Sequence, residues 1–161
     1  MRQIPLRPPT VPADKTPPTN SGRHQIKDGM TSAPDTFGCN RCWPSNPDDM
    51  WTALRMLKLE LDLVDESHFM VKVRSCPSCQ QQFVSVFAET IDWADGDDPQ
   101  FWCLLPIMPA ETKMLLGTGG ELITQLNSLA PERRSLCRDA PKAEAPTCYW
   151  GTGVVIGRHD S

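Results

Sequence analysis

The chain has 161 residues, a hydrophobic fraction of 39% and a formal net charge of −4. It has no apolar stretch near the roughly 20 residues of a membrane-spanning helix and no apolar run of a secretory signal, which argues against a membrane protein. Its seven cysteines are an odd number, so at least one thiol stays outside any disulfide scheme, and we expect a protein of the reducing cytoplasm.

Residues 1–36 are rich in proline and contain no aromatic side chain. Such a segment buries too little apolar surface to offset the entropy cost of ordering it, so we predict a disordered tail or tether. Its proline spacing also suits a docking peptide in the polyproline conformation, which is the alternative. Residues 37–161 then remain for a single folded domain.

The first helix is predicted over residues 47–56. Asn46 can accept hydrogen bonds from the first helical amides, and Pro47 fits the first helical position. Asp48 and Asp49 place negative charge at the positive end of the helix dipole. Together these residues mark the start of a short helix.

Residues 57–64 alternate leucine with charged side chains, which is the two-residue period of a half-buried strand. The same leucines also continue a helical stripe that begins at Met50, so a longer helix is the alternative. We favour the strand, because a helix through residue 64 would leave Met56, Leu59 and Leu63 on its exposed face.

The remaining pattern predicts an α+β fold built on an antiparallel meander, with the short N-terminal helix and a C-terminal helical segment. A loop is expected from Asp92 to Gln100, and glycines should interrupt the C-terminal helical segment after Leu116. The predicted elements are strands at 69–74, 83–91, 101–107 and 148–156, helices at 109–116 and 121–129, and one helical turn at 133–138.

Four cysteines form two C-x2-C pairs, separated by residues 43–75; they are Cys39, Cys42, Cys76 and Cys79. Two residues between thiolates allow a tight turn, or knuckle, in which both sulfurs lie on one side and backbone amides point at them. Two such knuckles face to face provide the tetrahedral four-sulfur shell that zinc prefers. A redox C-x2-C would begin a helix in a βαβ unit, whereas the second pair lies between two predicted strands.

This arrangement resembles the zinc-ribbon class of domains over about residues 37–92. The resemblance implies one structural Zn²⁺ per chain, clamped by the two knuckles. Four thiolates close the coordination shell, so we expect a structural rather than a catalytic ion. One feature departs from compact ribbons, whose knuckles are about 15 to 20 residues apart: here a helix and a pair of strands are inserted between them.

The other cysteines give weaker signals. Cys103 lies in an apolar run and is expected to be a buried hydrophobic residue. A second metal site of Cys137, Cys148 and His159 matches no known ligand spacing. The aspartates at 92–98 are expected to form a solvated turn rather than a calcium loop, and the glycines near 117–120 and 151–157 are expected to form turns rather than phosphate loops.

The acidic side chains are concentrated in residues 37–100, whose net charge is −6, whereas residues 101–161 are neutral. An acidic face can steer a basic partner, and Trp93 beside the acidic loop is the first choice for a contact residue. We therefore predict a non-enzymatic, zinc-stabilised interaction module, such as an adaptor, an assembly subunit or an inhibitor-like protein. Its expected partner is a protein, with a basic one as the best match.

Two other functions remain open. Nucleic-acid binding requires a basic face, and the cluster of Arg133, Arg134 and Arg138 is expected to cover a helix surface instead. An enzyme would need a site assembled in space, for example around Cys103 or the glycine turns, because the three histidines form no catalytic motif.

Overall fold

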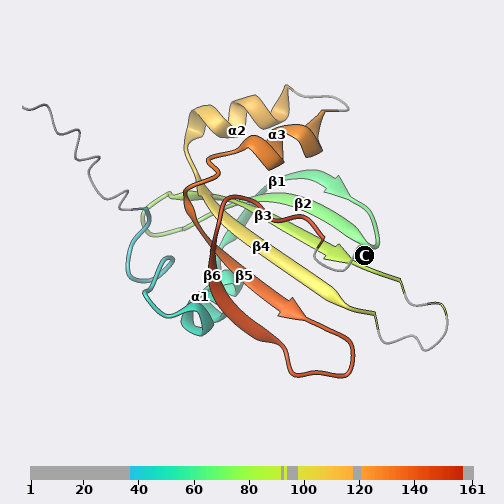
Figure 1. Ribbon diagram of the computed structural model, residues 1–161. Helices are drawn as coiled ribbons and strands as arrows, with labels where there is room; N and C mark the ends of the chain where they lie inside the picture. Colours follow the sequence, from blue (N-terminus) through green and yellow to red (C-terminus); the bar gives the residue numbers. More distant parts are fainter. Residues whose placement is uncertain (1–36, 92, 94–97, 118–120, 158–161) are drawn as a thin grey trace, which may run out of the picture. The chain divides into compact units, whose positions relative to one another are not determined.

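A six-stranded antiparallel sheet forms the centre of the structure, a computed structural model that describes residues 37–91, 93, 98–117 and 121–157. Each strand pairs with the next one in the chain, so the order is β1-β2-β3-β4-β5-β6 (Figure 1). The α+β class and the antiparallel meander predicted from the sequence are therefore confirmed. The tail predicted for residues 1–36 lies outside the described residues, and so does most of the acidic loop at 92–98.

The helices are short, and none within the described ranges has the length and apolar character needed to cross a bilayer. In chain order the elements are α1 (Pro47–Ala53), the 3-10 turn η1 (Leu54–Met56), β1 (Lys58–Asp65), β2 (Phe69–Ser75), β3 (Gln82–Glu89), β4 (Gln100–Ile107), α2 (Pro109–Leu116), α3 (Leu122–Ser128), β5 (Arg134–Ala140) and β6 (Thr147–Thr152).

The start of α1 follows the sequence prediction. The side chain of Asn46 accepts hydrogen bonds from the amides of Asp48 at 2.8 Å and Asp49 at 3.3 Å. The strand preferred for residues 57–64 is also confirmed as β1, an edge strand. Its pairing with β2 shifts register twice, and these irregularities break the simple alternation, so that Leu59 is 43% exposed.

The helical turn predicted at residues 133–138 is wrong, because this segment belongs to β5. It pairs with β4 on one side and β6 on the other, and Leu136 and Cys137 are buried. Pairing on both sides outweighs the weak local preference of this short segment. The last strand is shorter than predicted: β6 ends at Thr152, where Gly153 turns the chain with a φ of +63°.

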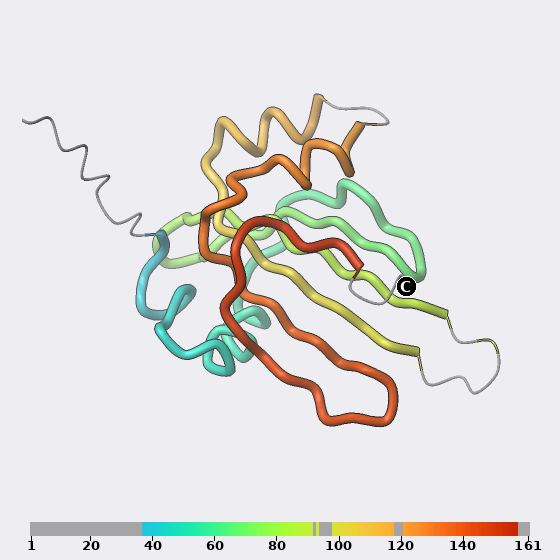
Figure 2. Tube along the Cα trace, viewed as in Figure 1, coloured from blue at the N-terminus to red at the C-terminus, as the bar shows by residue number. Residues whose placement is uncertain are grey.

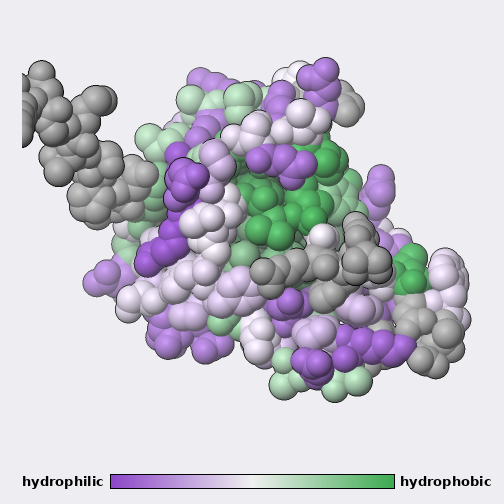
Figure 3. Space-filling model, viewed as in Figure 1, coloured by the Kyte–Doolittle hydropathy of each residue, from purple (hydrophilic) through white to green (hydrophobic). Residues whose placement is uncertain are grey.

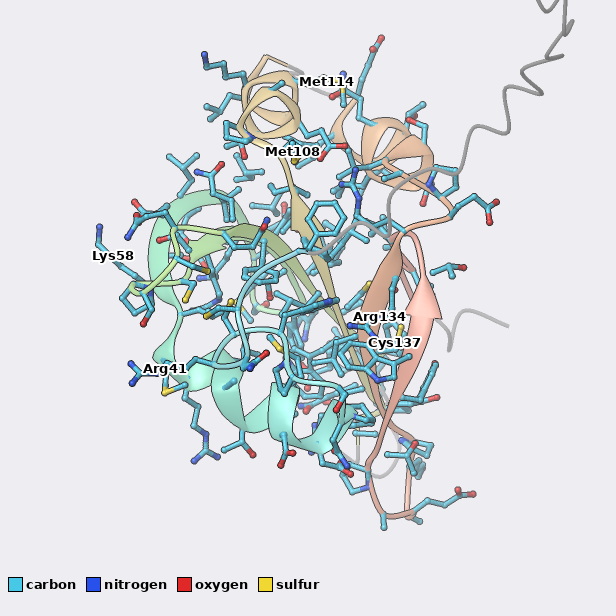
Figure 4. All side chains as sticks on the ribbon, turned by 90° about the vertical axis from the view of Figure 1, so that its left-hand side faces the viewer. Arg41, Lys58, Met108, Met114, Arg134 and Cys137 are labelled. Carbon is cyan, nitrogen blue, oxygen red and sulfur yellow. The ribbon has the colours of Figure 1, made fainter. Side chains whose placement is uncertain are left out.

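Helices cover both faces of the sheet (Figure 4). On the α2/α3 face, strand side chains such as Val71 and Phe101 form one buried cluster with Leu115 and Leu126 of the helices. On the α1 face, Met50 and Ala53 pack against Phe83, Leu104 and Leu136 in a second cluster. The sheet is thus the middle layer between two separate cores.

The chain after β6 turns back across the α2/α3 face (Figure 2). Val154, Val155 and Ile156 pack against the cluster on that face, and the amide of Val155 donates to the sulfur of Cys103 at 3.5 Å. Figure 3 shows an apolar area beside α3, where partly buried side chains of this cluster reach the surface. The turn at Gly153 therefore completes one of the two cores.

Substituting Gly153 by alanine should destabilise the domain. A Cβ there would lie 3.1 Å from backbone atoms of Pro131, and the positive φ is itself unfavourable for alanine. We expect a loss of about 1–3 kcal/mol in the free energy of unfolding, measured by denaturant titration. Gly117→Ala is the matched control: an added Cβ would meet nothing closer than 3.7 Å, so the change should stay within about 0.5 kcal/mol. Equal effects of both substitutions would contradict this account.

Candidate metal centre

The structure brings together the four cysteines of the two C-x2-C pairs. Cys39 and Cys42 lie in the turn before α1, and Cys76 and Cys79 lie in the turn between β2 and β3. Their four sulfur atoms all lie within 4.8 Å of one another. The second pair is on a β-hairpin, as in a zinc ribbon, whereas the first is followed by a helix. The ribbon likeness is therefore limited to the second knuckle and the shared cluster.

The first knuckle is held by backbone hydrogen bonds. The amides of Cys42 and Trp43 both donate to the carbonyl of Cys39, at 3.0 and 2.8 Å. Gly38 precedes the knuckle with a φ of +70°, and a Cβ on it would lie 2.8 Å from the sulfur of Cys42. Glycine at this position thus allows the backbone to pass close to a sulfur atom.

The second knuckle closes the β2–β3 hairpin. The amide of Gln80 donates to the carbonyl of Cys76, and the amide of Cys76 donates to the carbonyl of Gln81, both at 2.9 Å. The side chain of Gln81 connects the two knuckles to the sheet: it accepts from the amide of Gly38 at 3.2 Å and donates to the carbonyl of Ile107 at 3.0 Å. No pattern in the sequence predicts this role for Gln81.

Aromatic side chains hold the first knuckle against the α1 face of the sheet. The ring of Trp43 lies 5.5 Å from that of Phe83 and 5.0 Å from that of Trp150, measured between centroids. The guanidinium of Arg134 lies over both tryptophan rings. Cys42 and Cys76 belong to the same buried cluster as these side chains. The cysteine centre is therefore part of the core on this face.

Backbone amides and burial give the four thiols different acidities. Donation from the amides of Arg41 and Cys42 lowers the pKa of Cys39 to about 7. Burial opposes ionisation of Cys76, but amides of Cys79 and Ser78 outweigh it and lower its pKa. Burial raises the pKa values of Cys42 and Cys79. Four thiolates this close would need a cation to compensate their charge, and the cluster could hold a metal ion in that role.

The remaining cysteines do not form a second cluster with one another. Cys103 and Cys137 are buried on the α2/α3 face, opposite each other on β4 and β5. Cys148 pairs with Arg138, so it lies on the α1 face, away from Cys137. His159, the third member of the alternative metal site, lies outside the described residues.

Comparisons of the chain with protein-family models, with curated protein sequences and with solved structures gave no match. A functional assignment therefore rests on the geometry of this chain.

Replacing Cys76 by serine should abolish metal binding. Elemental analysis of the purified chain should give about one metal ion per molecule, and near zero for Cys76→Ser. The free energy of unfolding should fall by several kcal/mol, because a four-thiolate metal site is worth on the order of 10 kcal/mol. Cys148→Ser removes a half-buried cysteine outside the cluster and should keep the metal. Loss of metal in both variants, or in neither, would contradict the site.

Metal affinity should decrease as the pH is lowered, because a thiol binds a metal ion only after it loses its proton. The raised pKa values of Cys42 and Cys79 keep both protonated near neutral pH in the metal-free chain, and Cys39, with a pKa of about 7, becomes protonated below that pH. As the pH falls, we expect Kd to rise by at least about two powers of ten per pH unit above pH 7 and by at least about three below it. Competition with a chelator of known affinity at each pH measures this slope, and a flat profile would exclude thiolate ligands.

Proposed function

We propose that the cysteine centre holds one structural Zn²⁺ and that the chain is a zinc-stabilised module for binding a protein partner. A tetrahedral zinc site with bonds of about 2.3 Å has sulfur–sulfur edges of about 3.8 Å. Two of the observed distances agree, with 3.8 Å between the sulfurs of Cys39 and Cys42 and 3.6 Å between those of Cys42 and Cys79. Four thiolates leave no open position for a substrate, which supports a structural role.

The proposed contact surface is the end of the sheet opposite the cysteine centre. In an antiparallel meander the β1–β2, β3–β4 and β5–β6 connections lie at one end, and the β2–β3 turn with its knuckle lies at the other. A hollow of about 360 Å³ at the first end is lined in part by Glu89, Asp98 and Glu144. Hydrogen bonds from Gln100 and His68 lower the pKa of Glu89, so its charge persists at neutral pH. This acidic end suits a basic partner.

The observation that carries the proposal is the exposure of Trp93. Its side chain lies in the β3–β4 connection and is 90% exposed. The other tryptophans are occupied: Trp43 packs against Trp150, and Trp51 packs against Trp102. Tryptophan is enriched among residues that dominate binding energy at interfaces, whereas an isolated exposed ring contributes nothing to the core. Trp93 is therefore the proposed anchor of the contact.

The alternative of nucleic-acid binding has weaker support. The arginines expected on a helix surface lie instead on or next to β5, where Arg138 lies over Trp51 at 4.6 Å and Trp102 at 4.8 Å. Arg134 lies over Trp150 at 4.3 Å. These rings and cations already contact each other, so they are poorly available for stacking on bases or binding phosphates. The net negative charge of residues 37–100 also argues against nucleic-acid binding, because it repels phosphates.

Affinity capture with the zinc-loaded chain tests this function. A partner recovered at low salt and identified by mass spectrometry should then be purified and titrated against variants. Trp93→Ala should weaken binding by tenfold or more, because truncating a hot-spot tryptophan costs about 2 kcal/mol or more. Glu144→Lys should slow association and reduce its salt dependence.

The matched control is Met114→Ala, which truncates an exposed apolar side chain of α2, across the sheet from Arg41 and α1 (Figure 4). It should leave the affinity unchanged. Equal binding by wild type and Trp93→Ala would refute the contact surface, and salt-dependent gel shifts with duplex or single-stranded probes would favour the nucleic-acid alternative.

A further inference from the structure

Arg74 is a half-buried arginine of the central sheet. It lies on β2, on the α1 face of the sheet, where it pairs with Phe83 of β3. Its Nε is buried and has no hydrogen-bond partner, and no described carboxylate forms an ion pair with it. A buried donor without a hydrogen-bond partner is costly, so an acceptor placed beside this Nε would stabilise the protein.

Other buried or stacked arginines of the described chain are compensated. Arg133 also has an unpartnered Nε, but its Nη1 donates to Glu111 at 2.7 Å and to the carbonyl of Pro106 at 3.0 Å. Arg134 and Arg138 lie over tryptophan rings. Arg74 therefore differs from these three arginines, each of which has an ion pair or lies over an aromatic ring.

Arg74 lines a small pocket of about 70 Å³ on the same face. Ser85, which pairs with Lys72 across β2 and β3, contributes a hydroxyl to the wall. Leu54, Phe87 and Trp102 supply apolar walls. The pocket thus combines a guanidinium and a hydroxyl, both able to donate hydrogen bonds, with surfaces that suit a short alkyl group.

Charge and size favour a carboxylate over a phosphate. Lys72 also lines the pocket, but its ammonium group is held by Asp62 at 2.9 Å and Asp65 at 2.8 Å, so these charges and that of Arg74 sum to zero. A carboxylate therefore leaves one net negative charge at the pocket and a phosphate dianion leaves two, so the carboxylate is the better match. A planar carboxylate carries a single charge and matches the fork of a guanidinium with two parallel hydrogen bonds.

We propose that this pocket binds the carboxylate of an aspartate or glutamate side chain from a peptide segment of a partner. This small, open pocket has room for a carboxylate and its adjoining methylene. A longer ligand would extend out of it, as a peptide backbone does. The site shares no lining residue with the acidic hollow, and it does not depend on the function proposed for that surface.

Nuclear magnetic resonance of the zinc-loaded, full-length chain tests the proposal. The probes are blocked glutamate (N-acetyl, N-methylamide), blocked glutamine, propionate and inorganic phosphate. Blocked glutamate should shift the Nε–H signal of Arg74 and the indole signal of Trp102 in a saturable way, and blocked glutamine should not. Arg74→Gln should abolish saturation, Arg74→Lys should weaken binding about tenfold, and Ser85→Ala about fivefold.

Arg55→Gln is the matched control, because it removes the same charge from an exposed position and should leave binding unchanged. If Arg74→Gln does not fold, the lysine and alanine variants decide the question. Saturation that is absent, equal for blocked glutamine, or unaffected by all three pocket substitutions would overturn the site. Tighter binding of phosphate would overturn the choice of anion, and binding of propionate without blocked glutamate would overturn the peptide source.

Discussion

The meeting of four sulfur atoms from two distant turns is the constraint on which the α1 face depends. Residues 37–46, the described segment before α1, contain neither a helix nor a strand. The position of this segment is set by the knuckle hydrogen bonds, by Gln81 and by the packing of Trp43. Cys42 and Cys76 are part of the buried cluster on this face and Cys39 packs against it, whereas none of the four cysteines belongs to the cluster under α2 and α3. The proposed zinc ion therefore stabilises one layer directly and the other only through the sheet.

The cysteine centre and the two proposed contact surfaces involve different residues of the fold. The cysteine centre occupies one end of the meander, and the acidic hollow with Trp93 belongs to the other. The Arg74 pocket lies between β2, β3 and β4 on the α1 face, bordered by Leu54 of η1. A partner that carries both basic and acidic side chains could thus contact the acidic end and the Arg74 pocket without touching the four cysteines.

Local signals in the sequence accounted for much of the architecture. The cap at Asn46 predicted α1, the leucine alternation predicted β1, and the repeated cysteine spacing predicted the cluster. These three predictions are confirmed because each depends on a few neighbouring residues or on a repeated chemical motif. The fold class followed from the same periodicities.

The features that the sequence did not predict depend on partners far along the chain. The sequence pattern predicts a helical turn at residues 133–138. These residues lie on or next to β5, and the strand conformation of β5 comes from its pairing with β4 and β6, which the local pattern does not contain. Arg138 contacts Trp51 and Trp102, but these residues are far apart in the chain and no sequence motif predicts the contact. The pocket at Arg74 becomes visible only when the register places Ser85 beside Lys72. Residue types alone could not distinguish these arginines from ordinary surface charges.

The strand order also bears on how the chain is assembled during translation. Because every strand pairs with its predecessor, the sheet can grow one strand at a time as the polypeptide leaves the ribosome. Cys39 and Cys42 emerge first and have no sulfur partners until the β2–β3 turn follows them. Capture of the ion can then join α1 to a finished hairpin while β4 to β6 are still being synthesised, so the metal would act as a template for the second half of the molecule.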